Sequence, residues 1–284
     1  MYGYGNSMFL FNNGIIANNT IDSDAQAFIT AASITDTTQK NAINQLVLDL
    51  KSANIWTKMK AIYPFVGGTA SSHRFNLKAP TTNTSDFYLI PYGGITHSSN
   101  GVQFDGTSGY FDTQLIPSTS LTNYSSHLSY YSRTSRGYRN SIAIGSYQGT
   151  PTYNDMDLRF YANGYNGVSN KTASAQYDGF SSLDYADYTP LTTACFAIAS
   201  KTASNLNKIY ENGTLKGTNT TTSTRSLPNV RALIGAASNG ISSVTGYDNL
   251  ESAFASIGDG LTDAEATSLY NAVQTFNTTL SRNI

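Results

Sequence analysis

The chain has 284 residues, of which 12% are Asp, Glu, Lys or Arg, and its formal net charge at pH 7 is −1. This balance argues against nucleic acid as a partner, since nucleic-acid-binding proteins carry an excess of basic residues. No stretch approaches the length of a membrane span, and the apolar run at Met8 is too short for a signal peptide. We therefore expect synthesis in a cytoplasm, without a signal peptide and without a membrane partner.

Residues 1–22 combine Tyr-Gly-Tyr-Gly with two Asn-rich stretches and carry too few apolar groups to fold alone. Two interpretations stay open, a frayed tail and a segment that attaches to a partner surface. In the second case the candidate attachment residues are Tyr2, Tyr4, Phe9, Phe11, Ile15 and Ile16.

Residues 23–61 are predicted to form a helical connector. Ser23 and Gln26 have the spacing of a capping box, which predicts a short helix. Asp36 and Gln39 repeat a similar signal, and an apolar stripe at helical spacing follows from residue 43 to residue 50. A second helix of about four turns is expected there.

Residues 62–284 are predicted to form a β-sandwich. Short runs rich in Tyr, Phe, Val and Thr alternate with Gly, Asn, Ser and Pro turns. Asn212-Gly213 is typical of a two-residue hairpin, and the capping box at Thr262 and Glu265 predicts a closing helix over residues 262–282. The expected strands are Gly101–Asp105, Tyr110–Leu115, His127–Ser132, Ser141–Gly145, Leu158–Tyr161, Ala194–Ser200, Asn207–Glu211 and Arg231–Gly235.

Three stretches in this order resemble the laminin-G/concanavalin superfamily. They are Val102–Phe111 with its Phe-Asp-Gly, Ile209–Leu215 with its Asn-Gly turn, and Leu233–Ala236 followed by Phe254–Glu265. The resemblance implies a mainly β fold, a concanavalin-like antiparallel β-sandwich (jelly roll) with an N-terminal helical segment and a packed C-terminal helix.

Residues 27–32, 54–68 and 71–78 also resemble a module of tailed-phage virion proteins, found in crAss-like and other phages of Bacteroidetes. The likeness runs from about Phe28 to Arg282. It implies localisation in the virion, as a head or tail fibre or another capsid-attached appendage that displays a lectin-like domain. Other virion proteins, capsid or tail, would contact residues 1–22. We expect a homo-oligomer, with a trimer as the default. The resemblance implies no ligand and no catalytic residue.

Glycosidases on concanavalin-like folds place carboxylates at alternate strand positions. Asp155 and Asp157 are the only comparable pair, and no third acid follows them. We interpret both as turn and edge carboxylates, with weak Ca²⁺ binding as the minority alternative. The sequence therefore predicts no enzyme, no cofactor and no other metal site, and a divergent glycoside hydrolase is the least favoured function.

The remaining candidates for chemistry are isolated. His73, His97 and His127 are widely separated and lack zinc-site spacing, so we interpret them as polar core or turn residues. Cys195 lies in an apolar run and is expected in the core.

Two tyrosine-rich stretches are the candidate glycan-binding residues. Aromatic rings stack on sugars, and Arg offers a fixed fork for carboxylate or phosphate. The candidates are Tyr131, Arg133, Arg136 and Tyr138 in the first stretch, and Tyr153, Tyr161 and Tyr165 in the second. For the first stretch, an exposed hairpin with solvated charges is the alternative. The leading hypothesis is a virion appendage subunit, with host-surface polysaccharide as a further partner. A free carbohydrate-binding module is the alternative.

Overall fold

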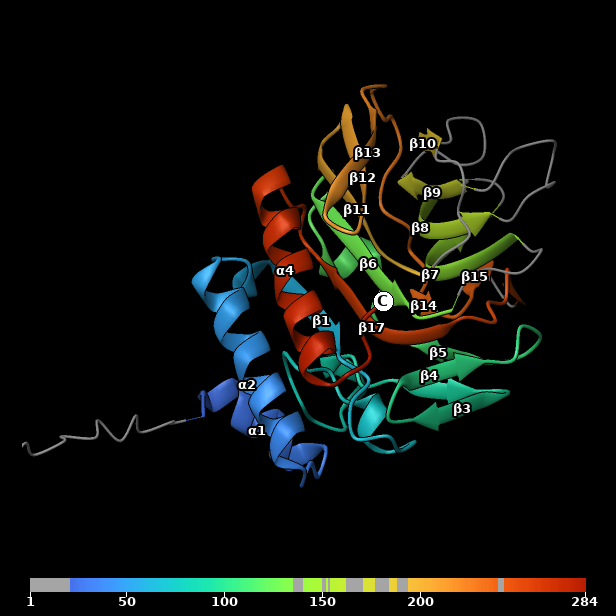
Figure 1. Cartoon of the computed structure of the whole chain (residues 1–284). Helices are drawn as coiled ribbons and strands as arrows, with labels where there is room; N and C mark the ends of the chain where they lie inside the picture. Colours follow the sequence, from blue (N-terminus) through green and yellow to red (C-terminus); the bar gives the residue numbers. More distant parts are fainter. Residues whose placement is uncertain are drawn as a thin grey trace, which may run out of the picture.

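The computed structural model describes residues 21–134, 140–149, 152, 154–161, 171–176, 184–187, 194–239 and 243–284. It has three layers, which Figure 1 shows from the side: helices on the left, a first sheet in the middle, and a second sheet whose strands β7 to β10 lie on the right. This arrangement confirms the predicted class of a β-sandwich with N-terminal helices and a packed C-terminal helix.

The first sheet is the middle layer, and its strands pair in the antiparallel sense. In spatial order they are β13 (Thr214–Asn219), β12 (Leu206–Glu211), β11 (Cys195–Ala203), β6 (Ser126–Ser132), β17 (Glu251–Gly258), β4 (Gly101–Phe104) and β3 (Ile95–Ser98), and β1 (Met59–Tyr63) pairs with β17.

The second sheet forms the outer β layer. In spatial order it contains β10 (Asp184–Asp187), β9 (Lys171–Gln176), β8 (Asn154–Tyr161), β7 (Asn140–Gln148), β14 (Leu233–Ile234), β5 (Tyr110–Asp112) and β2 (Ile90–Tyr92). A short hairpin of β15 (Ala237–Asn239) and β16 (Ser243–Thr245) joins it, and β15 runs parallel to β7.

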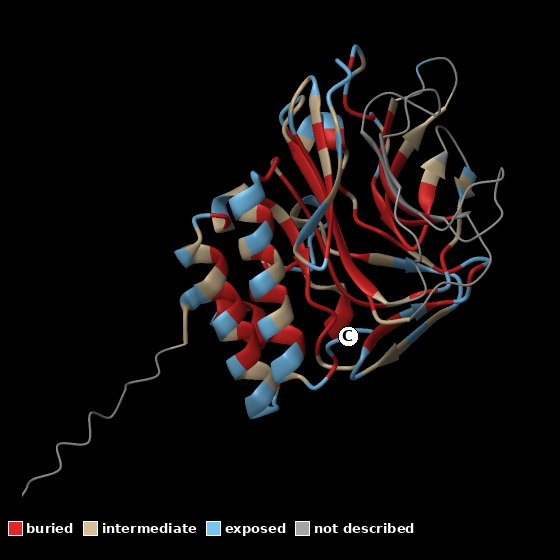
Figure 2. Cartoon of the chain, turned by 45° about the horizontal axis from the view of Figure 1, so that its top comes forward, coloured by how far each residue is buried: buried red, intermediate tan, exposed pale blue. Residues whose placement is uncertain are grey.

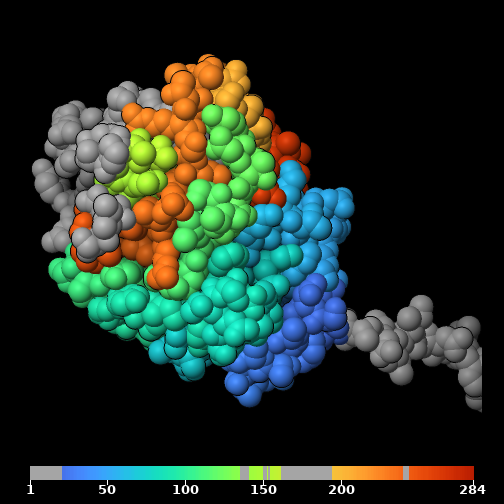
Figure 3. Space-filling model, turned by 180° about the vertical axis from the view of Figure 1, so that it is seen from behind, coloured from blue at the N-terminus to red at the C-terminus, as the bar shows by residue number. Residues whose placement is uncertain are grey.

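The helical layer covers the outer face of the first sheet. It consists of α1 (Ser23–Ala31), α2 (Thr37–Ser52) and α4 (Asp263–Thr279), while α3 (Pro117–Ser120) and the 3-10 turns η1 (Trp56–Lys58), η2 (Ser72–Arg74) and η3 (Thr84–Asp86) lie in connections. Seen from behind, residues of α1 and α2 (blue) form one continuous surface with the segment that follows them (teal; Figure 3). Among the described helices, none is both long enough and apolar enough to cross a membrane.

Two hydrophobic cores result from this layering. One lies between the helices and the first sheet, and the other lies between the two sheets. Strand β6 contributes to both: Tyr131 packs in the helix-side core, whereas Leu128 and Tyr130 pack between the sheets. All seven residues of β6 are therefore buried, and Figure 2 shows the burial running through the middle layer.

The local signals at turns and helix ends place most elements correctly. Asn212 and Gly213 have φ of 48° and 75°, which a type I′ hairpin turn requires. The Thr262–Glu265 capping box begins α4 as predicted. At α1 the prediction is off by one residue, because the side chain of Asp22 caps the helix instead of Ser23. Cys195 is buried, as expected.

The helices pack against the first sheet of the sandwich. Strand β1 begins at Met59, before the predicted start of the sandwich, and pairs with β17 in the centre of the first sheet. Helices α1, α2 and α4 share one core. The described residues from 21 onward therefore pack as one body around the first sheet.

Candidate functional site

The outer face of the second sheet carries a groove of about 440 Å³. Side chains alternate along a strand, so Phe111 enters the core while its neighbours Tyr110 and Asp112 point outward. Directly paired residues share a face, which places Tyr92 beside Tyr110 and Leu233 beside Asp112. Strands that are distant in sequence thus build one continuous polar and aromatic surface.

Tyrosines form one end of the groove. The rings of Tyr92 and Tyr110 stack at a centroid distance of 4.9 Å with 9° between their planes, and Tyr247 lies 6.2 Å from Tyr110. Tyr92 is 44% exposed, so its ring offers a solvent-facing apolar surface. Burial, followed by the neighbouring Tyr92, raises the pKa of Tyr110 above its ordinary value. Its hydroxyl therefore keeps its proton and can donate a hydrogen bond.

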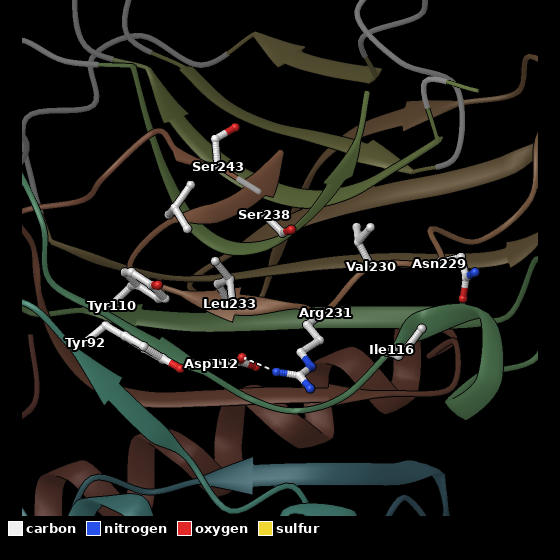
Figure 4. Close-up of a pocket in the computed structure, with 11 residues that line it drawn as sticks. Tyr92, Tyr110, Asp112, Ile116, Asn229, Val230, Arg231, Leu233, Ser238 and Ser243 are labelled. Atoms are coloured by element: carbon white, nitrogen blue, oxygen red, sulfur yellow. Dashed lines mark hydrogen bonds and ion pairs between the residues drawn. The ribbon is translucent and has the colours of Figure 1, made fainter. Parts of the chain in front are cut away.

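An ion pair occupies the centre of the groove. Arg231 Nη1 donates to Asp112 Oδ2 at 3.0 Å, and the backbone N–H of Gln114 donates to Asp112 Oδ1 at 2.8 Å. Asp112 is buried, whereas the side chain of Arg231 is 51% exposed. Figure 4 shows the pair between the two tyrosines at one end and Asn229 at the other.

The far end of the groove is polar and held by hydrogen bonds. Ser118 Oγ donates to Asn229 Oδ1 at 3.1 Å, and Gln148 Oε1 accepts from the Asn229 backbone N–H at 3.0 Å. The Asn229 amide nitrogen is thus turned to serve as a donor. Ser238 and Ser243 line the groove from the β15–β16 hairpin (Figure 4).

A second polar cluster lies on the same face of the sheet. Asp155, Asp157 and Arg159 alternate along β8 with Met156, Leu158 and Phe160, which fill the core between the sheets. Across neighbouring strands, Asp157 pairs with Gly145, Gly145 pairs with Leu233, and Leu233 pairs with Asp112. Three strand spacings, about 14 Å, therefore separate this cluster from the centre of the groove.

The cluster contradicts the interpretation of Asp155 and Asp157 as turn and edge carboxylates. Both lie within a strand that has neighbours on each side, and both are fully buried. Arg159 Nε donates to Asp157 Oδ2 at 2.8 Å, whereas neither carboxyl oxygen of Asp155 has a hydrogen-bond partner. Burial, with a contribution from the Asp157 charge, raises the pKa of Asp155 to about 8.

Asp155 and Asp157 were also the candidates for weak Ca²⁺ binding. Ca²⁺ takes six or more oxygen ligands. Within the described ranges, no group of three or more His, Cys, Asp and Glu side chains is placed to hold a metal ion. Asp157 is already engaged by Arg159.

The first group of predicted glycan-binding residues does not line the groove. Tyr131 is fully buried beneath α4, where its ring lies 5.7 Å from Phe196. Arg133 donates to the backbone oxygen of Arg282 at 2.8 Å and to Glu251 Oε2 at 2.6 Å. Tyr131 therefore has no exposed surface to offer a glycan, whereas Arg133 is partly exposed and holds the C-terminal segment.

Other predicted residues lie outside the described part of the chain. They are Arg136, Tyr138, Tyr153 and Tyr165, together with Tyr2, Tyr4, Phe9, Phe11, Ile15 and Ile16. Tyr161 is the last residue of β8, and its side chain is likewise not described. These predictions stay predictions.

Two of the separated histidines come together in the fold. His73 Nδ1 lies 3.0 Å from His97 Nδ1, and His73 Nε2 accepts from the backbone N–H of Gly68. Burial and the neighbouring His97 lower the pKa of His73 to about 3. Burial also lowers the pKa of the half-buried His97, so both rings are neutral at physiological pH, and the pair acts as a packing contact.

Neither a protein-family model nor a curated protein matches the chain. Solved structures with a similar fold include a mutant of Trypanosoma rangeli sialidase that displays trans-sialidase activity, with a TM-score of 0.50, 10% identity, and coverage of 82% of this chain and 39% of that one. Domain 4 of AbnA, a GH43 extracellular arabinanase from Geobacillus stearothermophilus, gives a TM-score of 0.49, 16% identity, and coverage of 75% and 98%. The chain thus spans about two fifths of the sialidase and nearly all of the arabinanase domain.

The prediction that the chain is not an enzyme is contradicted, because a similar fold occurs in a sialidase mutant that displays trans-sialidase activity. That prediction was based on the lack of a third acid after Asp155 and Asp157 and on their interpretation as turn and edge carboxylates, and the structure contradicts the second of these points. At these identities the likeness shows the fold alone and assigns no reaction.

Proposed function

We propose that the chain binds carbohydrate through the groove lined by Tyr92, Tyr110, Asp112, Asn229 and Arg231. The observation that carries the proposal is the stacked tyrosine pair beside the Asp112–Arg231 ion pair in one open groove. Sugars present an apolar ring face and a rim of hydroxyls. Aromatic rings and a few fixed polar groups match those two features.

The polar groups of the groove are fixed before a ligand arrives. Arg231 is held by Asp112, Asn229 is held by Ser118, and Tyr110 is fixed between two other tyrosines. Binding then orders few side chains, which limits its entropic cost. The fold's similarity to an arabinanase domain solved with arabinotriose and to sialidases is consistent with this proposal, which rests on the groove itself.

Tyr92→Ala is expected to weaken glycan binding about tenfold, because it removes the exposed face of the tyrosine stack. Binding is measured on a glycan array and then by calorimetry on the glycans that wild type retains. Tyr92→Phe keeps the ring and should keep most of the affinity. Leu215→Ala removes a similarly exposed apolar side chain from the first sheet and should change nothing. Undiminished binding by Tyr92→Ala would place the ligand elsewhere.

The wider context that we propose is a phage virion appendage, an inference that rests on the sequence resemblance over residues 28–282. In this context the sandwich is displayed and residues 1–22 contact the particle. Trimeric assembly and adhesion to host-surface polysaccharide belong to the same proposal.

Deleting residues 1–20 is expected to leave a folded protein that no longer joins particles. The deletion keeps Asp22, which caps α1 and pairs with Lys51 at 2.7 Å, so the helical layer retains its contacts. The measurement is co-sedimentation of tagged protein with particles assembled in its absence, alongside a thermal melt. Equal incorporation of the truncated and the full chain would refute the attachment role.

Hydrolysis of a glycan is the second candidate function, and it is favoured by the contrast between Asp155 and Asp157. The raised pKa of Asp155 keeps it protonated at neutral pH, while Arg159 pairs with Asp157. Glycosidases use a protonated carboxyl group as the general acid together with a second carboxyl group. Both groups are buried, so hydrolysis requires a movement that admits substrate.

A further inference from the structure

The hydrogen bonds of Asp112 and Arg231 leave the groove with more available donors than acceptors. Both carboxylate oxygens of Asp112 already accept, one from Gln114 and one from Arg231, and the side chain is buried. Asp112 therefore has little capacity left for sugar hydroxyls. Arg231, in contrast, uses Nη1 as its single donor to the described residues and is half-exposed. The polar centre of the groove thus offers donors to a ligand and few acceptors.

The free donors of Arg231 have a specific geometry. The guanidinium group is planar, and its Nε and Nη2 donors form a side-on fork that fits the two oxygens of a carboxylate. Asp112 holds the group through Nη1 alone and leaves this fork open. The side chain of Arg231 is half-exposed, so a ligand that binds the guanidinium group must displace water from it. A neutral hydroxyl would gain little by replacing that water, whereas a carboxylate forms stronger, charge-assisted bonds.

The tyrosines place the fork within reach of a sugar ring. Tyr110 and Asp112 occupy alternate positions on β5, about 7 Å apart along the strand, and Arg231 binds Asp112 directly. A ring stacked on the tyrosines can thus extend an exocyclic carboxylate toward Arg231. Asn229 and the Tyr110 hydroxyl supply further donors at the two sides (Figure 4). Arg231 and Asp112 are the charged residues among the described groove-lining residues.

We infer that the groove selects an acidic sugar residue, of the uronic or sialic acid class, whose carboxylate binds the Nε and Nη2 edge of Arg231. This inference rests on the proposed carbohydrate-binding function and names its ligand class. The ring stacks on the tyrosine pair, and the carboxylate provides the selectivity. Asp112 acts as a positioning residue that holds the guanidinium in place.

The test compares acidic polysaccharides with the same polymers after reduction of their carboxyl groups to alcohols. Polygalacturonate, alginate and hyaluronate form the uronic arm, and colominic acid forms the sialic arm. Wild-type protein is expected to bind at least one acidic polymer at least tenfold more tightly than its reduced form, as measured by calorimetry. Arg231→Gln should remove this preference, so that the acidic polymer binds no more tightly than its reduced form.

Two controls test whether the loss of preference comes from a general loss of positive charge or from misfolding. Lys40→Gln removes one positive charge from α2, on the opposite side of the first sheet, and should keep the preference. A thermal melt shows whether Arg231→Gln is folded, and the comparison of polymers on wild type needs no variant at all. Equal binding of acidic and reduced polymers overturns the acidic ligand class and leaves carbohydrate binding standing. Failure to bind these polymers and every glycan on the array overturns both.

Discussion

Arg282→Met is expected to destabilise the protein by about 3–5 kcal/mol, measured by urea denaturation at pH 7. Arg282 is fully buried near the C-terminus and uses all three of its nitrogens as donors. Nε donates to Asn277 Oδ1 at 2.8 Å, while Nη1 and Nη2 reach the backbone oxygens of Phe65, Pro64 and Ala253 at 2.7, 2.6 and 3.0 Å. Methionine has a similar volume but leaves these oxygens unpaired.

The large effect follows from the place of these acceptors in the fold. They belong to the segment after β1, to β17 and to α4, so one side chain ties the helical layer to the centre of the first sheet. Arg282→Lys should recover only part of the loss, since an ammonium has fewer donors and no planar fork. Asn283→Ala, at the exposed neighbouring position, is the matched control. An unchanged urea midpoint for Arg282→Met would mean that water can replace the guanidinium.

The fold class could be predicted from sequence because its signals are local. The Asn212-Gly213 turn requires two positive φ angles, and the Thr262–Glu265 box satisfies its own backbone groups. Such features depend on neighbours within a few residues. The Phe-Asp-Gly stretch is similar in kind, since Asp105 accepts hydrogen bonds from the backbone of Thr107, Ser108 and Gly109.

The groove could not be predicted in this way, because strand order creates it. Tyr92 and Tyr110 belong to β2 and β5, and Arg231 precedes β14, which lies beside β5 only in the folded sheet. Nothing near Arg231 in sequence indicates Asp112 as its partner. Pairing of distant strands is the information that a single sequence does not display.

The exposure of Tyr131 and Asp155 could not be predicted for a different reason: each lies on a strand that is covered on both faces. Alternating polar and apolar residues predict one exposed face. Strand β6 lies between the second sheet and α4, so even its serines are buried. On β8, the Asp-Met-Asp pattern indicates an exposed acidic face, yet Asp155 has no exposed surface. Polar residues on a strand that is covered on both faces therefore produce the same sequence pattern as an exposed edge strand.

Asp155→Asn is expected to stabilise the protein at pH 7 by about 4 kcal/mol, at about 1.4 kcal/mol per pH unit between the unfolded pKa and pH 7. The pKa of Asp155 is about 8 in the fold and 3.8 in an unfolded chain, so unfolding at pH 7 releases its proton. The folded pKa is raised, so its contribution is present below pH 3.8 and is lost as the pH rises toward 8. An amide has the shape of the protonated acid and no proton to release.

Asp155→Asn also separates hydrolysis from binding. If Asp155 is the general acid, the variant should lose at least 100-fold in the release of reducing sugar while it binds glycan normally. A wild-type protein that cleaves no polysaccharide would end the hydrolysis candidate and leave the stability prediction intact.

Two buried histidines make the protein less stable as the pH falls, which is opposite to the effect of Asp155. In Asp155→Asn only the effect of the histidines is left. Burial lowers the pKa of His73 to about 3 and that of His127 to about 4, below the unfolded value of 6.5. Their contribution is complete above pH 6.5 and is lost as the pH falls, by about 2 kcal/mol each at pH 5. Between pH 7 and pH 5, wild type gains about 3 kcal/mol from Asp155, which offsets most of this loss.

The prediction is therefore a nearly flat stability profile for wild type between pH 7 and pH 5, and a fall of about 4 kcal/mol for Asp155→Asn over the same interval. Urea denaturation of both proteins at pH 5, 6, 7 and 8 measures it. Asp49→Asn removes a carboxylate from α2 and should keep the wild-type shape. Parallel profiles for wild type and Asp155→Asn would show that Asp155 is ionised in the fold. That result would remove the proton that the hydrolysis candidate requires.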